Sequence, residues 1–196
     1  MIVFFNMSSI LSTESLGPLK EVLLIKNKVF GDDRGFFLES FNSKSFQDAT
    51  GLAPIFVQDN HSRSNKGVLR GIHYQLAPNA QGKLVRVING AVFDVAVDLR
   101  RSSQTFGQWA GCELNGERGE MLWIPPGFGH AFLVLEDRTD FLYKTTDYYA
   151  PQSEASIAWN DPQINVEWPK GFKKENIMLS VKDQAAPRLS AARIFD

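Results

Sequence analysis

Two of the three histidines occur in glycine-rich strings of similar pattern. His73 lies in Gly67-Val-Leu-Arg-Gly-Ile-His73-Tyr-Gln75, and His130 closes Gly119-Glu-Met-Leu-Trp-Ile-Pro-Pro-Gly-Phe-Gly-His130. A histidine side chain has an unperturbed pKa of roughly 6.5, so it can exchange a proton near neutral pH or bind a metal. A lone histidine is more often a hydrogen-bonded core residue, but two in matching strings favour one shared site.

Both strings resemble the two motifs of cupins, small β-barrels that hold a metal on three histidines and a glutamate. Here Gln75 stands where the second histidine is expected, and no glutamate follows it at the expected spacing. Two imidazoles without a carboxylate make a poor transition-metal site. The single cysteine, Cys112, excludes an internal disulfide and a cysteine-rich zinc site. We therefore expect no metal.

The elements that must position these histidines are mainly strands. Between glycines and prolines, apolar residues recur with period two or in short β-branched runs. Strands are predicted over residues 21–29, 36–41, 55–60, 67–75, 83–88, 91–99, 108–114, 121–124, 131–135, 141–146 and 157–159. Asn89-Gly90 tolerates positive φ, so the strands on either side of it are predicted to pair as a hairpin. About ten short strands indicate a sandwich or barrel, and the cupin resemblance implies an all-β double-stranded β-helix, a jelly-roll barrel.

Helix signals are few. A helix is predicted over residues 43–50, capped by Asn42 or Ser43 and ended by Gly51, with another short turn over residues 153–157. No repeat or linker divides the chain, so we expect a single cupin-type domain over residues 1–196. Residues 1–20 are expected to be an extension of it that can be flexible.

Composition excludes several classes of function. Lys and Arg number 21 against 22 Asp and Glu, so the chain lacks the overall basic charge of nucleic-acid-binding proteins. No apolar run reaches the roughly 18 to 20 residues needed to cross a bilayer. The apolar opening Met1-Ile-Val-Phe-Phe5 is too short for a signal peptide. We expect a soluble cytoplasmic protein without a membrane or nucleic-acid partner.

Longer strings around the histidines carry a more specific resemblance. Phe56-Val-Gln-Asp-Asn-His-Ser62, Gln81-Gly-Lys-Leu-Val-Arg86 and Phe93-Asp-Val-Ala-Val-Asp-Leu-Arg100, with the two histidine strings, closely resemble the dTDP-4-dehydrorhamnose 3,5-epimerase family. The resemblance runs from about residue 29 to 183. It implies a cofactor-free homodimer that epimerises C3 and C5 of dTDP-4-dehydro-6-deoxy-D-glucose, in making dTDP-L-rhamnose for surface polysaccharides.

The same resemblance assigns catalytic residues. A ketone at C4 acidifies the hydrogens at C3 and C5, so epimerisation needs a base, an acid and a group that stabilises the enolate. His73 matches the base, and Asp183, in Ser180-Val-Lys-Asp183, matches the carboxylate that orients it. Tyr143 matches the proton donor, and Lys83 matches the lysine beside the C4 oxygen.

Further matches concern substrate binding. Strict alternation would turn Arg70, three residues before His73, to the opposite sheet face, yet the family places this arginine at the pyrophosphate. Arg34 and Glu39 match residues that contact the nucleotide, partly across the dimer interface. The other expected substrate-binding residues are Gln58, Asn60 and His130, with Phe30 and Tyr149 as stacking or shaping residues.

Several readings stay open on the same framework. Relatives that epimerise only C5 or only C3 of a related nucleotide-linked 4-keto-6-deoxy sugar share the pattern, and a keto-sugar isomerase could reuse the base. A non-catalytic cupin that binds a sugar nucleotide is a different class, but it would be expected to lose the proton-transfer residues. The presence of both His73 and Tyr143 favours the double epimerase.

Overall fold

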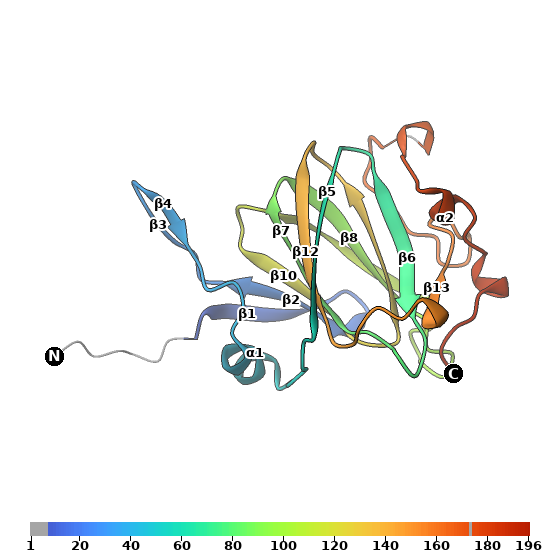
Figure 1. Ribbon diagram of the computed structural model, residues 1–196, viewed down its shortest axis with the longest axis horizontal. Helices are drawn as coiled ribbons and strands as arrows, with labels where there is room; N and C mark the ends of the chain where they lie inside the picture. Colours follow the sequence, from blue (N-terminus) through green and yellow to red (C-terminus); the bar gives the residue numbers. More distant parts are fainter. Residues whose placement is uncertain (1–7, 173) are drawn as a thin grey trace.

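The structure is a computed structural model that describes residues 8–172 and 174–196. Two antiparallel sheets face each other and form the predicted cupin barrel (Figure 1). The six-stranded sheet has the order β1 (Ile10–Leu16), β2 (Leu19–Asn27), β10 (Glu120–Ile124), β7 (Lys83–Asn89), β12 (Thr139–Thr145), β5 (Gln58–Ser64). The five-stranded sheet has the order β13 (Glu154–Ser156), β6 (Leu69–Gln75), β11 (Phe128–Val134), β8 (Ala91–Asp98), β9 (Trp109–Asn115).

The prediction that the strands on either side of Asn89-Gly90 pair as a hairpin is wrong. Strand β7 pairs with β10 and β12, whereas β8 pairs with β11 and β9 in the other sheet. The turn is therefore a corner of the barrel, where the chain crosses between sheets. Gly90 has φ +77°, and a Cβ there would lie 2.3 Å from Oγ1 of Thr139, so the corner requires glycine.

Apolar side chains from both sheets fill the barrel away from its polar cavity. This inner core includes Val22, Val85, Val92, Leu114, Leu122, Phe128, Phe132, Val134 and Phe141. The outer face of the five-stranded sheet is also buried, because the segments that follow β13 pack against it through Ile157, Ile164 and Leu189. Strand β8 is consequently buried on both faces, not on one alone.

A small aromatic cluster covers part of the outer face of the six-stranded sheet. Helix α1 (Ser43–Thr50) has the predicted bounds, with Asn42 as its N-cap and Gly51 in the left-handed conformation at its end. Its buried Phe46 packs edge-on against Trp123, at 5.9 Å between ring centroids. The helix thereby holds the chain that leads into β5.

The N-terminal part departs from the sequence-based expectation. Strand β1 pairs along β2, so Ile10–Leu16 belong to the sheet and do not form a flexible extension; residues 1–7 of that predicted extension lie outside the described residues. The predicted strand over residues 36–41 is shorter. Strands β3 (Phe30–Asp32) and β4 (Gly35–Phe37) instead form a hairpin that projects away from the barrel (Figure 1).

Near the C-terminus, the turn expected over residues 153–157 is a 3₁₀ turn, η1 (Pro151–Ser153), followed by β13. The strand expected over residues 157–159 is therefore displaced toward the N-terminus. Further short elements are η2 (Lys174–Asn176), α2 (Val181–Gln184) and η3 (Leu189–Ala191). Among the described residues, no helix is long and apolar enough to cross a membrane.

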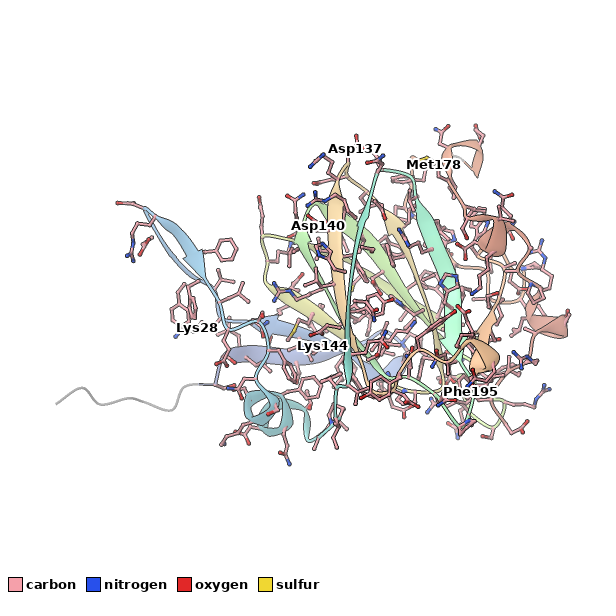
Figure 2. All side chains as sticks on the ribbon, in the orientation of Figure 1. Lys28, Asp137, Asp140, Lys144, Met178 and Phe195 are labelled. Carbon is pink, nitrogen blue, oxygen red and sulfur yellow. The ribbon has the colours of Figure 1, made fainter. Side chains whose placement is uncertain are left out.

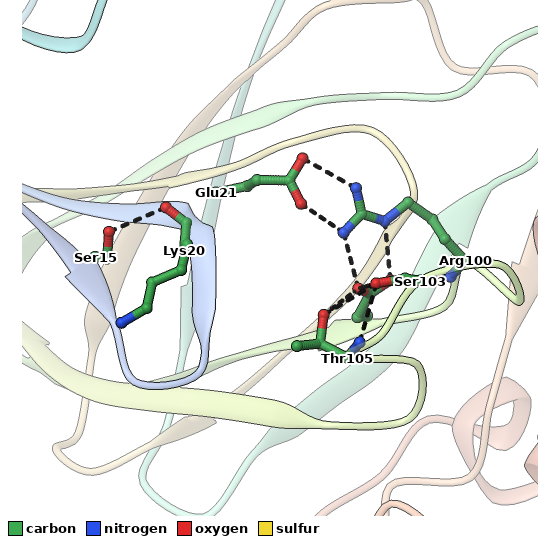
Figure 3. Close-up of polar contacts among 7 residues, drawn as sticks. Ser15, Lys20, Glu21, Arg100, Ser103 and Thr105 are labelled. Atoms are coloured by element: carbon green, nitrogen blue, oxygen red, sulfur yellow. Dashed lines mark hydrogen bonds and ion pairs between the residues drawn. The ribbon is translucent and has the colours of Figure 1, made fainter.

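An ionic cluster around the buried Asp98 ties the β8–β9 loop to β2. Asp98 is fully buried and accepts hydrogen bonds from Arg100, Ser103 and Thr105. Arg100 also donates to both carboxylate oxygens of Glu21, at 3.0 and 2.6 Å (Figure 3). Burial raises the pKa of Asp98, but these donors outweigh it and bring the pKa to about 2. The carboxylate stays ionised and fastens the two sheets together.

Candidate active site

A polar cavity of about 270 Å³ lies between the two sheets. Strands β5, β7 and β12 line it from one sheet and β6 and β11 from the other. The lining residues are Asn60, His61, Ser62, Arg70, His73, Lys83, His130, Phe132 and Tyr143. Six of the residues predicted from the sequence to act on or bind a substrate are thus brought together: Asn60, Arg70, His73, Lys83, His130 and Tyr143.

His73 is paired with a carboxylate from the far end of the chain. Its Nε2 lies 2.5 Å from Oδ1 of Asp183, which is 4 % exposed. Burial raises the pKa of Asp183, but the hydrogen bonds from His73, Ser180 and the Gly71 backbone outweigh it, and the pKa is lowered overall. An ionised carboxylate only accepts, so Nε2 of His73 carries the hydrogen and Nδ1 is the nitrogen free to take a proton.

Hydrogen bonds around Asp183 restrict the position of its side chain. The hydroxyl of Ser180 accepts from the Asp183 backbone N–H and donates to Oδ2 at 2.7 Å, which caps helix α2. Just upstream, Met178 exchanges backbone hydrogen bonds with Gly67 and Leu69 at the start of β6 (Figure 2). The tail is therefore fastened to the strand that carries His73.

A β-bulge in β6 explains why Arg70 faces the cavity, although strict alternation from His73 would turn it to the opposite face of the sheet. His130 pairs with His73 and Phe132 with Arg70, so between these pairs the single residue Ala131 of β11 faces two residues of β6, Gly71 and Ile72. The extra residue turns Arg70 and His73 into the same cavity. Gly71 has φ +122° at the bulge, and a Cβ there would lie 2.5 Å from Cβ of Ala131.

Lys83 is a buried ammonium next to the histidine pair. It is 9 % exposed, and its Nζ lies 3.5 Å from the backbone oxygen of His73. Burial lowers its pKa to about 8, against the opposing attraction of Asp94 and Glu154. The side chain remains mostly charged at neutral pH.

His130 forms a second histidine–aspartate pair. Its Nε2 lies 3.1 Å from both carboxylate oxygens of Asp94, which is fully buried. Burial lowers the pKa of His130 below its ordinary value, despite the attraction of Asp94. The imidazole is therefore predominantly neutral at pH 7.

Tyr143 reaches the cavity from the opposite side to His73. It lies on β12 in the six-stranded sheet, where it is opposite Val85 and Asn60, whereas His73 lies on β6 in the five-stranded sheet. Burial raises the pKa of its phenol, with Arg70 opposing the shift. A molecule between the sheets would have an imidazole on one face and a protonated phenol on the other.

Gln75 has a structural role, because its side chain hydrogen-bonds the backbone of neighbouring loops. Its amide donates to the backbone oxygens of Asn79 and Tyr148 and accepts from the Ala150 N–H. All of these partners belong to loops that close one end of β6. Within residues 8–172 and 174–196, no group of three or more His, Cys, Asp or Glu side chains is arranged to hold a metal ion.

Other predicted residues lie outside the cavity. Gln58 donates to Asn60 Oδ1 and accepts from the Tyr149 N–H, so both Gln58 and Tyr149 lie beside it. Phe30 and Arg34 are on the projecting hairpin, where Arg34 pairs with Asp32, and Glu39 lies between the hairpin and α1. Within one chain these three are not brought to the cavity.

Sequence reasoning missed five residues at or beside the cavity. His61, Ser62 and Phe132 line it, Asp94 pairs with His130, and Glu154 bonds Tyr149 and Lys182. Asp94 had a signal, since it is a carboxylate in a mostly apolar strand. The other four occur in ordinary strand or loop patterns that carry none.

The fold and the cavity together define a cupin barrel with histidine–carboxylate pairs at a polar cavity between its sheets. Residues 17–191 match the family model described as dTDP-4-dehydrorhamnose 3,5-epimerase. The enzyme of that name from Salmonella typhimurium is 55% identical over 178 residues, which are 91% of this chain and 96% of that one. The Pseudomonas aeruginosa enzyme is 52% identical, over 90% and 96% of the two chains.

A solved structure agrees with these sequence matches. The dTDP-6-deoxy-D-glucose-3,5-epimerase of Legionella pneumophila, crystallised with dTDP-4-keto-L-rhamnose, superposes with a TM-score of 0.85. It is 51% identical, and the match covers 90% of this chain and 92% of that one. This chain belongs to the dTDP-4-dehydrorhamnose 3,5-epimerase family, which is a family of isomerases.

Proposed function

We propose that this chain epimerises C3 and C5 of dTDP-4-dehydro-6-deoxy-D-glucose to give dTDP-4-dehydro-L-rhamnose, in the biosynthesis of dTDP-L-rhamnose. The observation that carries the proposal is the placement of the His73–Asp183 pair and Tyr143 on opposite sheets of one cavity, with Lys83 beside them. Epimerisation requires a proton to leave one face of a ring and another to arrive on the other face. Family membership supports the same reaction.

His73 is the base that removes the proton. Nδ1 takes the hydrogen from a carbon next to the C4 ketone, and the C–H electrons move into an enolate. The imidazolium that results is stabilised by Asp183, whose carboxylate lies 2.5 Å from Nε2. The same contact holds the ring in the required tautomer.

Lys83 stabilises the enolate. A fixed ammonium in a buried site interacts more strongly with a full negative charge on the C4 oxygen than with the neutral ketone. Its surroundings favour this role, because burial leaves few waters to screen the charge.

Tyr143 delivers the new proton on the opposite face. The enolate carbon takes the phenolic proton, the ketone re-forms, and His73 returns its proton to solvent as the tyrosinate is reprotonated. The raised pKa of Tyr143 favours the protonated phenol before each turnover. No cofactor is needed, since each proton and charge has a protein group to hold it, so we propose a metal-independent reaction.

The nucleotide half is proposed to lie across two chains. Arg70 would bind the diphosphate, with Gln58, Asn60 and Tyr149 around the nucleotide and His130 at the sugar. The hairpin residues Phe36 and Phe37 are 65% and 69% exposed, which suits burial against a second copy. In such a homodimer, Phe30, Arg34 and Glu39 would reach the partner's cavity. We place the enzyme in the cytoplasm, where its single cysteine would stay reduced.

Product analysis by NMR tests the reaction. Purified protein is incubated with dTDP-4-dehydro-6-deoxy-D-glucose, and the products are trapped by borohydride reduction. Rhamnose configuration at both carbons is expected. A sugar inverted at a single carbon would indicate a mono-epimerase, and unchanged sugar with tight dTDP binding would leave only a binding protein.

A further inference from the structure

The cavity lining is polar at every position but one. Among the described residues that form it, Phe132 is the only side chain without a nitrogen or oxygen atom. Each of the other lining side chains carries a hydrogen-bonding or charged group. The cavity therefore has one hydrocarbon patch in an otherwise polar wall.

Phe132 cannot readily move away from the cavity. It is 5 % exposed, and its ring stacks on Phe141 at 4.1 Å between centroids with 17° between the planes. The ring of His130, held in turn by Asp94, also neighbours it, at 5.9 Å between ring centroids. Close packing of this kind fixes the position of a ring and the shape of the surface it presents.

The patch is also at the reacting part of the cavity. Phe132 lies two residues along β11 from His130, which is directly opposite His73, and its own partner on β6 is Arg70. A ligand that places a carbon at His73 and a diphosphate at Arg70 would therefore extend along the part of the cavity that Phe132 lines.

The proposed substrate has one matching group. Around the ring of a 4-keto-6-deoxy sugar, the C6 methyl is the single apolar substituent, and it is bonded to C5, one of the two carbons that exchange a proton. We propose that Phe132 is the residue that selects a 6-deoxy sugar, by packing its ring against the C6 methyl group. This inference rests on the proposed function.

The selection arises from desolvation. A C6 hydroxyl pressed against the ring would lose its water without gaining a protein partner. Apolar sites reject an added hydroxyl by at most roughly 100-fold, so the expected preference lies between about tenfold and 100-fold.

Two stable ligands measure this preference directly. dTDP-6-deoxy-D-glucose and dTDP-D-glucose differ only by the C6 hydroxyl, and neither can react because C4 is not oxidised. Their Kd values are measured by calorimetry for the wild type, Phe132→Tyr and Phe132→Leu, with thermal unfolding as a check on folding. Phe132→Tyr keeps the ring and adds a hydroxyl partner, whereas Phe132→Leu keeps the surface apolar.

The wild type and Phe132→Leu are expected to bind the 6-deoxy ligand at least about tenfold more tightly, and Phe132→Tyr is expected to bind the two about equally. Equal affinities in the wild type, or an undiminished preference in Phe132→Tyr, would overturn the role of Phe132 while leaving the epimerase proposal intact. Failure of the wild type to bind either ligand would instead overturn the proposed function, and the inference with it.

Discussion

The carboxylate of Asp183 lies 2.5 Å from Nε2 of His73, although 110 residues separate the two in the chain. Helix α2 and the Met178 backbone bring the tail to β6 for this contact. The tail thereby completes the proposed base.

Asp183→Asn is expected to keep the fold and lower kcat by at least about 100-fold, because an amide can donate to Nε2 and favour the wrong tautomer of His73. Proton exchange at C5 of the substrate, followed by NMR, measures the loss. Asp161→Asn is a matched control, since Asp161 is also buried but accepts from the backbone N–H groups of Gln163, Ile164 and Leu189 and does not line the cavity. Comparable losses in both variants would indicate general damage and not a role for Asp183.

The rate should fall at alkaline pH as Lys83 loses its proton. Its pKa of about 8 means that the ammonium is present below that pH and lost above it, together with the stabilisation of the enolate. The profile of kcat/KM, which reports groups of the free enzyme, should therefore decline above about pH 8. In Lys83→Arg the charge persists to far higher pH, so the alkaline limb should be absent; a limb at the same pH in that variant would assign it to another group.

The buried charge of Lys83 should also lower the free energy of unfolding. Its pKa is lowered on folding from 10.5 to about 8, so the unfolded chain binds more protons between these values and stability rises with pH across that window. Below pH 8 this shift lowers the free energy of unfolding by on the order of 3 kcal/mol. Lys83→Met is expected to be inactive but to have a higher Tm at pH 7, with the gain shrinking toward pH 10. A lower Tm at pH 7 would contradict this.

Mixing two inactive variants tests the shared nucleotide site. If Arg34 acts on the partner's cavity, an Arg34→Ala chain paired with a His73→Ala chain has one cavity with both defects and one with neither. Co-refolded mixtures should then regain activity in proportion to the mixed dimers that form. If Arg34 acts within its own chain, both cavities stay defective and no activity returns. Light scattering on the same samples reports the oligomeric state.

Much of the fold could be predicted because it follows local patterns. Alternating residues identified most strands, and Asn42 and Gly51 set both ends of α1. The pairing of β7 and β8 could not be predicted in this way, because Asn89-Gly90 looks the same at a hairpin and at a barrel corner. Strand β1 was missed because its burial pattern is weak and only its pairing with β2 orders it.

The residues of the site also divide into those that could be predicted from the sequence and those that could not. His73, His130 and Lys83 could be found from their strings, and Arg70 only by setting alternation aside, since the bulge at Gly71 is a property of the paired strands. Phe132 could not be found at all. Its proposed role depends on the polar residues that surround it in space, and all of these but His130 come from four other strands.

The most direct test of the proposed proton transfers is exchange in heavy water on dTDP-4-dehydro-6-deoxy-D-glucose, with C3 and C5 followed separately by NMR. The wild type is expected to introduce deuterium at both carbons. His73→Ala should abolish exchange at both, while Tyr143→Phe should still exchange but accumulate little inverted product. Undiminished exchange in His73→Ala would contradict the assignment of His73 as the base.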